Sequence, residues 1–395
     1  CNFISWLGQT QNRTEFDYVD NHAYWNHPSF PEKAWSLPVG TNHLSVIKKM
    51  AEVPRGMMAS RVFGKPFTVT EFNYVYPNKY RAESGPVIGA YSALQDWAGL
   101  YRFAWAHNHD DAVGEGKFSQ DFNIAMQPMD QLSERIGVLL FIRRDVSPAK
   151  TRVPFVVTSE SLAEKGYQSN FPDKYQDLGL AIQIGSLFID KTHPFKGNFQ
   201  QATGFSPLHV DNMAGINFIP VDELYKKYIN SDMIWSENGQ IELCRDSGMF
   251  RVVTPRTECF VLPEGCKDSG TSVEAESKKG FSVVSVSSMD GKPIVESERM
   301  LVFHLTDVRC SKMKFRNQRE DIVESWGEMP YLVRRGEAVV RLPAIKSNMK
   351  VWAIDMSGKR QEQIPAEMKG GKLTFTAKTV RDQDKTGMLY EISAE

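Results

Sequence analysis

Residues 64–76, with the sequence GKPFTVTEFNYVY, decide how the first part of this chain is interpreted. A turn signal at residues 64–66 precedes a short run of apolar and β-branched residues, a composition typical of a buried parallel strand. A single carboxylate, Glu71, stands where that run ends. Catalytic groups in (β/α)8 barrels lie at the C-terminal ends of the strands. Glu71 is therefore a candidate catalytic residue, and the alternative is a strand-end glutamate in a surface ion pair.

Two flanking stretches repeat this pattern of a strand that ends in polar and aromatic residues. Residues 16–20 lead into NHAYW at 21–25, and residues 99–105 lead into the polar segment 106–111. Apolar residues at helical spacing predict helices over 44–59, 84–97 and 120–143. Strands that alternate with helices in this order predict parallel α/β structure wound as in a barrel.

The composition limits the classes of protein that this chain can belong to. A length of 395 residues suits two or three domains. A net charge of −1 gives no electrostatic reason to expect a nucleic acid or an anionic membrane as partner. No apolar run approaches the ~20 residues of a membrane-spanning helix. The five cysteines show no CxxC spacing, which favours reduced thiols; a Cys259–Cys266 disulfide is the alternative for an exported protein.

Three motifs carry a resemblance to a known enzyme group. They are DNHAYWNHP at 20–28, KPFTVTEFNY at 65–74 and GLYRFAWAH at 99–107. They resemble strands six, seven and eight of the retaining glycoside hydrolases of clan A, a (β/α)8 group that includes β-galactosidases, cellulases and mannanases. The resemblance covers residues 14–110. It implies an oligosaccharide or polysaccharide substrate, no cofactor, and, by analogy, a secreted, periplasmic or cell-surface location.

The resemblance also implies roles for individual residues. Glu71 matches the nucleophile of strand seven. His22 and Tyr24 match a His-x-Tyr pair that places a histidine at the sugar site and a tyrosine hydroxyl against the nucleophile. Trp105 matches the tryptophan that forms the floor under the sugar. Three further residues are expected to bind substrate: Trp25, Asn73 and His107.

One part of the clan pattern has no counterpart in this chain. Retaining hydrolysis uses two carboxyl groups about 5–5.5 Å apart, one as nucleophile and one as acid/base. In the clan the acid/base glutamate follows an asparagine at the end of strand four, and strands one to five have no match here. We therefore expect an N-terminally truncated fragment that is inactive alone. The alternative for the N-terminus is that Cys1 carries the lipid of a processed lipoprotein.

The expected fold is α/β plus all-β, in three parts. Residues 1–147 would form the C-terminal part of a (β/α)8 TIM barrel, and residues 148–232 a small α/β or linker domain. In residues 233–395, short strands separated by turns predict a β-sandwich accessory domain.

Two other functions remain open from the sequence. A non-catalytic carbohydrate-binding or scaffold protein would use the tryptophans without needing a carboxylate at position 71. A metal-dependent barrel hydrolase would use the segment His107-Asn108-His109-Asp110-Asp111 as ligands. No metal is predicted, because such enzymes carry their His-x-His on the first strand rather than the last.

Overall fold

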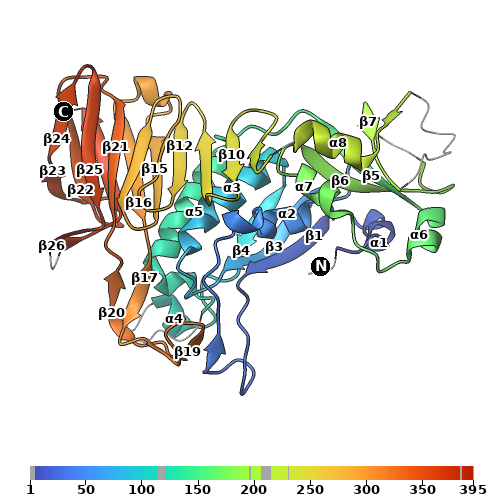
Figure 1. Cartoon of the computed structure of the whole chain (residues 1–395), viewed down its shortest axis with the longest axis horizontal. Coiled ribbons are helices and arrows are strands. Elements are labelled where there is room, and N and C mark those ends of the chain that lie inside the picture. The colour runs from blue at the N-terminus through green and yellow to red at the C-terminus, as the bar shows by residue number, and fades with distance from the viewer. Residues whose placement is uncertain are drawn as a thin grey trace.

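The chain forms a mixed α/β region with parallel sheets, followed by a large antiparallel β region (Figure 1). The computed structural model describes residues 5–113, 121–194, 197–205, 215–229, 231–382 and 385–394, and Cys1 lies outside them. Figure 1 shows the C-terminal sheets at one end, the first parallel sheet in the middle and the helices α6, α7 and α8 toward the other end.

The first parallel sheet has the order β1-β3-β4, with β1 at Val19–Trp25, β3 at Phe67–Tyr74 and β4 at Gly99–Arg102. Both pairings are parallel, which confirms the prediction from the sequence. The described residues form an open sheet here and no closed barrel. The boundaries differ from those predicted, because pairing with β3 extends β1 to Trp25 and keeps Glu71 inside β3.

Three helices follow these strands in turn: α2 at Glu52–Met58, α3 at Ser84–Leu94 and α5 at Pro128–Phe141. The helix expected over 44–59 is interrupted, because Met50 and Ala51 adopt left-handed φ values of 55° and 49°. A 3-10 turn at Ile47–Lys49 precedes this break and α2 follows it. Helices α3 and α5 approach so closely that a Cβ at Gly85 would lie 1.7 Å from the Ser133 carbonyl oxygen.

A second parallel pair, β5 at Arg152–Thr158 and β6 at Gln183–Ile189, forms the region that the sequence predicted to be a small α/β part. Every residue of β6 is buried, which explains its continuous apolar character. Around this pair lie α1 (Gln9–Thr14), α6 (Ser159–Lys165), α7 (Asp173–Leu178), α8 (Val221–Tyr228) and the short pair β7 (Gln201–Ala202) and β8 (Asn217–Phe218).

The antiparallel region is built on two sheets. The first has nine strands, in the order β23 (Arg360–Ile364), β22 (Met349–Ile354), β28 (Leu389–Ala394), β16 (Arg299–Leu305), β15 (Ser282–Ser288), β12 (Thr257–Leu262), β11 (Met249–Val253), β10 (Ile241–Cys244) and β9 (Met233–Trp235). The second has five, in the order β13 (Lys267–Ser269), β14 (Glu274–Lys279), β21 (Glu337–Pro343), β25 (Lys372–Lys378) and β24 (Ala366–Lys369).

The nine-stranded sheet is buried on both faces where β12 and β15 cross it. On β12, Cys259 and Val261 belong to the same hydrophobic core as α3 and α5. The alternate residues Phe260 and Leu262 belong to a second core, shared with the five-stranded sheet. The sheet is therefore a middle layer, and the antiparallel region is packed directly on the N-terminal helices.

A segment at residues 306–334, here called the arm, leaves the nine-stranded sheet and reaches the loops that follow β1 (Figure 1). Its strands β17 (Val308–Ser311) and β20 (Glu328–Val333) pair with each other. Its strands β18 (Lys314–Phe315) and β19 (Ile322–Ser325) form a small sheet with β2 (Val39–Gly40) from the N-terminal region. The arm therefore joins segments that lie almost 300 residues apart in the sequence.

The remaining short elements are α4 (His109–Val113), the hairpin β26 (Val380–Asp382) and β27 (Lys385–Thr386), and 3-10 turns at Arg81–Glu83, Ile124–Met126 and Ile294–Glu296. The four cysteines within the described part, Cys244, Cys259, Cys266 and Cys310, are all free, so the alternative of a Cys259–Cys266 disulfide is not realised. No helix in the described ranges is long and apolar enough to cross a bilayer.

Arg81 fastens the base of the arm to the α/β region. Its side chain is fully buried, and its Nε lies 3.1 Å from Asp130 of α5. One terminal nitrogen lies 3.4 Å from Asp307, and the other donates to the Val308 carbonyl at 3.1 Å. The guanidinium also lies over the Tyr76 ring, 4.7 Å from its centroid. A buried cation of this kind is tolerated only because each of its nitrogen atoms has a partner.

We expect Arg81→Ala to lower the free energy of unfolding by about 3–5 kcal/mol, because it leaves two buried carboxylates without one of their partners. Denaturant unfolding measures this change. The matched control is Arg144→Ala, since Arg144 forms an exposed ion pair with Asp96 and should cost under about 1 kcal/mol. Equal losses in the two variants would contradict the role assigned to Arg81.

Candidate active site

A bulge in β3 orients Glu71. The pairing with β1 moves from Asp20↔Thr68 to His22↔Glu71, so β3 contributes one residue more than β1 over this interval. The pairing with β4 is irregular at the same position, between Val69 and Phe72. A bulge redirects the side chains that follow it. As a result the consecutive residues Thr70 and Glu71 both contact His22 on the neighbouring strand.

Glu71 is the end of a connected set of polar side chains. The Tyr24 hydroxyl donates to Glu71 Oε2 at 2.7 Å, and His22 Nδ1 lies 3.3 Å from the same oxygen. The other ring nitrogen, His22 Nε2, lies 3.1 Å from Asp20 Oδ2 and 2.9 Å from Thr70 Oγ1. The structure thus brings together His22, Tyr24 and Glu71, the three residues predicted to be catalytic.

The environment of Tyr24 keeps its hydroxyl a hydrogen-bond donor. Burial, followed by the hydrogen bond to Glu71 and the charge of that carboxylate, raises the pKa of Tyr24 well above its ordinary value. The side chain of Glu71 is 34% exposed, which leaves it open to a ligand. A carboxylate with one oxygen occupied by a donor and an open side is the arrangement that a nucleophile needs.

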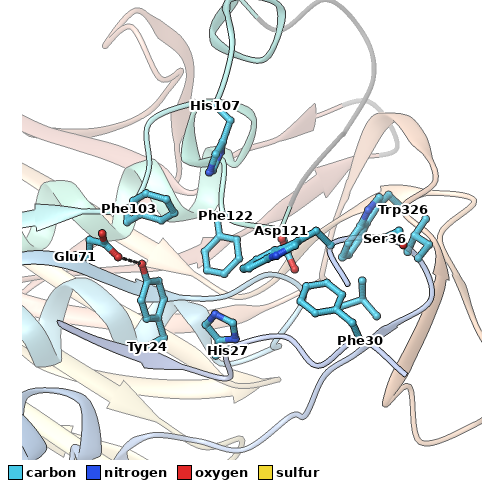
Figure 2. A pocket seen from close by; sticks show the side chains of 13 residues that line it. Tyr24, His27, Phe30, Ser36, Glu71, Phe103, His107, Asp121, Phe122 and Trp326 are labelled. Carbon is cyan, nitrogen blue, oxygen red and sulfur yellow. Dashed lines mark hydrogen bonds between the residues drawn. The ribbon is translucent and has the colours of Figure 1, made fainter. Parts of the chain in front are cut away.

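A pocket of about 730 Å³ lies in front of Glu71. Figure 2 shows Glu71 and Tyr24 at one end, Trp326 and Ser36 at the other, and Asp121 and Phe122 between them. Six aromatic side chains line it, together with two histidines, two carboxylates and three smaller residues. The lining residues are Tyr24, His27, Phe30, Trp35, Ser36, Leu37, Val39, Glu71, Phe103, His107, Asp121, Phe122 and Trp326. Its size and mainly apolar lining are those of a small-molecule site.

Phe122 is the centre of the aromatic wall. Its ring centroid lies 5.5 Å from that of Tyr24, 5.6 Å from that of His27 and 5.9 Å from that of Phe103. The Tyr24 contact is edge-to-face, at 89°. Edge-to-face packing of this kind is favourable for aromatic rings and holds them in fixed orientations.

Asp121 is a second carboxylate in the pocket wall. It is 9% exposed, and its Oδ2 has no hydrogen-bond partner in the described part of the chain. Burial raises the pKa of Asp121 to about 6, although its backbone surroundings and nearby His107 lower it. One oxygen of this carboxyl, Oδ2, therefore lacks the hydrogen bond that a buried polar atom normally has.

Two of the predicted substrate-binding residues lie away from the pocket surface. Trp25 is buried in the main core and donates from Nε1 to the Leu44 carbonyl at 2.9 Å. Asn73 is also buried, and its amide donates to the carbonyls of Phe103 and Phe122. Trp25 thus packs in the core, whereas Asn73 supports two rings of the pocket wall.

Of the other two predicted substrate-binding residues, one lines the pocket and the other does not. His107 lines the pocket, with its Nδ1 against the side-chain oxygen of Asn123. Trp105 is 55% exposed and lies outside the set of residues that line the pocket. The side chain of His109 is largely exposed, so His107 and His109 do not converge. Within the described ranges, no group of three or more His, Cys, Asp or Glu side chains could hold a metal ion.

Sequence reasoning missed most of the pocket wall. His27 lies at the end of the motif at 20–28, and Phe30 follows in a loop rich in turn formers and aromatics, but neither was predicted to be a site residue. Trp35 follows in the same connection, and Trp326 comes from the arm. Asp121 and Phe122 fall within the helix predicted over 120–143, but α5 begins only at Pro128, so these two residues lie in the segment before it.

No protein-family model matches this chain, and no curated protein matches it. The site is therefore interpreted from its own geometry, together with the resemblance of the three strand motifs.

We expect Asp121→Asn to change how stability depends on pH. An aspartate with a pKa of about 6 in the folded chain and 3.8 in the unfolded chain binds more protons when folded between these values. The wild-type protein therefore loses stability as pH rises from about 4 to about 6, by up to about 3 kcal/mol. The asparagine variant should lack this loss.

Unfolding midpoints of both proteins across this pH range measure the difference. The control is Asp96→Asn, because Asp96 is an exposed aspartate paired with Arg144. If the unfolding midpoints of Asp121→Asn and Asp96→Asn depend on pH in the same way, burial does not destabilise the ionised form of Asp121.

Proposed function

We propose that this chain comes from a retaining glycoside hydrolase. In that enzyme Glu71 would be the nucleophile. The observation that supports this most is the hydrogen bond of 2.7 Å from Tyr24 to Glu71, at the edge of an aromatic pocket. This is the contact that the resemblance to clan A implies. A β-linked oligosaccharide or polysaccharide is the substrate class.

We further propose that β1, β3 and β4 are strands six, seven and eight of a (β/α)8 barrel. Their parallel pairing and intervening helices support this assignment. Within the described residues β1 and β4 are the two edges of the sheet, so each has one side on which a neighbouring barrel strand could pair.

The proposed reaction has two steps. Glu71 attacks the anomeric carbon, the glycosidic C–O bond breaks, and the leaving oxygen takes a proton from an acid. Water then attacks the glycosyl ester, loses its proton to the same group and releases Glu71. Tyr24 occupies Oε2 of Glu71, which leaves Oε1 to form the ester. We assign the acid/base to a carboxyl group on a barrel strand outside these three, as in the clan.

A carbohydrate-binding protein without catalysis is the second candidate. The number of aromatic rings in the pocket supports it, since such rings pack against the C–H face of a sugar and need no nucleophile. The two candidates differ in what they require of Glu71. A binding protein would tolerate Glu71→Gln, whereas an enzyme would lose turnover and keep its affinity.

We expect Glu71 to be labelled when the full-length gene product is incubated with 2-deoxy-2-fluoro glycosides that carry a dinitrophenolate leaving group. Such a leaving group departs without protonation, so the result does not depend on the acid/base. Peptide mapping by mass spectrometry locates the label. Glu71→Gln should abolish labelling, and Glu52→Gln, an exposed glutamate of α2, should not.

Labelling at another residue would transfer the role of nucleophile to that residue. No labelling by any sugar, combined with measurable oligosaccharide binding, would favour the binding protein.

Tyr24→Phe should slow the labelling of Glu71 by about 10- to 100-fold, because it removes one hydrogen bond to a charged group. The rate is followed by intact-mass spectrometry over time. The control is Tyr101→Phe, a change at an exposed tyrosine of β4. An unchanged rate in Tyr24→Phe would mean that the hydroxyl does not assist the nucleophile.

A further inference from the structure

The pocket extends beyond the surroundings of Glu71. Its far part, here called the distal end, is lined by Phe30, Ser36 and Trp326 (Figure 2), and Trp35, another lining residue, packs against Phe30. Tyr24, Phe103 and His107 line the part near Glu71. A sugar held with its anomeric carbon at Glu71 would leave the distal end for another group of the same ligand.

Trp35 is a large apolar residue that is mostly exposed to solvent, so core packing does not account for its presence here. Its side chain is 71% exposed, and its backbone has φ of 60°, in the left-handed region. A bulky residue in this region is strained, and such strain persists where the surrounding structure or a function requires it. The ring centroid lies 4.9 Å from that of Phe30 and 6.4 Å from that of Phe122. Trp35 is thus held as a large apolar surface against the pocket.

Between the Glu71 end and the distal end, the pocket wall has a polar group with one atom that lacks a hydrogen-bond partner in the described part of the chain. Asp121 lines the same pocket, is more than nine-tenths buried, and leaves its Oδ2 without a hydrogen bond among the described residues. Figure 2 shows Asp121 between the Glu71 end and Trp326. A ligand hydroxyl group is a donor of the size and chemistry that would satisfy this oxygen.

The opposite wall of the distal end is rigid. Trp326, near the start of β20 in the arm, packs at 5.7 Å from the ring of Tyr76 in a separate small core. That core also contains Val39 of β2 and Val323 of β19, which are paired strands. The wall is therefore preorganised by sheet pairing and core packing, which lowers the entropic cost of binding.

We propose that the distal end is a second sugar subsite, where Trp35 stacks on the C–H face of a pyranose and Asp121 accepts hydrogen bonds from its hydroxyl groups. This inference rests on the proposed function, because it takes the first sugar to be at Glu71. It makes the substrate an oligosaccharide of at least two residues. The aromatic and carboxylate combination matches a ring that is apolar on its face and polar around its edge.

The test measures affinity in the Glu71→Gln background, where no turnover is expected. Isothermal titration with a panel of β-linked glucose, mannose, xylose and galactose sugars compares each disaccharide with its monosaccharide. We expect the disaccharide of the preferred sugar to bind at least about tenfold tighter, a difference of about 1.4 kcal/mol. Adding Trp35→Gly should remove most of this gain, and adding Asp121→Ala, which deletes the acceptor oxygens, should reduce it.

Two controls separate a subsite from a general loss of structure. Glycine adopts φ of 60° freely, so Trp35→Gly should unfold at the same temperature as its parent or higher. Trp235→Ala removes another exposed tryptophan, on β9, and should keep the gain in affinity. Loss of the gain in Trp35→Gly, with stability retained, would support the subsite.

Two results would overturn the inference. One is a gain in disaccharide affinity that persists in Trp35→Gly, and the other is equal affinity for monosaccharide and disaccharide throughout the panel. A different result would overturn only the proposed function: no covalent label on Glu71, although the disaccharide gain is present and depends on Trp35. In that case the distal end binds sugar in a protein that does not use Glu71 as nucleophile.

Discussion

Buried charged side chains must be paired, and their pairing connects three parts of the structure around the site: the arm, helix α5 and the strands of the first parallel sheet. Asp130 of α5 contacts Arg81 at 3.1 Å and Arg102 at 2.8 Å, and Arg102 contacts Asn73 Oδ1 at 2.9 Å. Arg81 in turn contacts Asp307 at the base of the arm. Each of these side chains is buried, so none can lose its partner without a large desolvation penalty. The arm, the helix and the strands are therefore fixed relative to one another.

This network also determines the shape of the pocket. Asn73 receives its orientation from Arg102 and uses its amide group to hold the carbonyls of Phe103 and Phe122. These two rings form the wall next to Tyr24. The arm, whose base contacts Arg81, supplies Trp326 to the opposite wall. A network of side chains outside the pocket lining thus positions the side chains that line the pocket.

Side chains alternate between the two faces of a strand, and a bulge interrupts that alternation in β3. These two facts explain which site residues could be predicted. The neighbours Tyr24 and Trp25 lie on opposite faces of β1, so one reaches Glu71 while the other enters the core. The sequence predicted that both lie at the site, Tyr24 against the nucleophile and Trp25 against the substrate, because alternation assigns faces only once the buried face is known. The bulge at Thr70 and Glu71 has no local sequence signal, since it arises from pairing with both neighbouring strands.

The sequence by itself determined the parallel α/β character and the approximate places of α3 and α5, and its resemblance to clan A pointed to the set His22, Tyr24 and Glu71. These follow from apolar periodicity and from motifs within about 100 residues, which are local properties. Only the tertiary structure decided the rest of the pocket, because Trp35, Asp121 and Trp326 come from segments with no mutual pattern. Pairing of β2 with β19, together with the buried ion pairs of Arg81, brings those segments to one place. Such contacts depend on the complementarity of folded surfaces, which no short stretch of sequence contains.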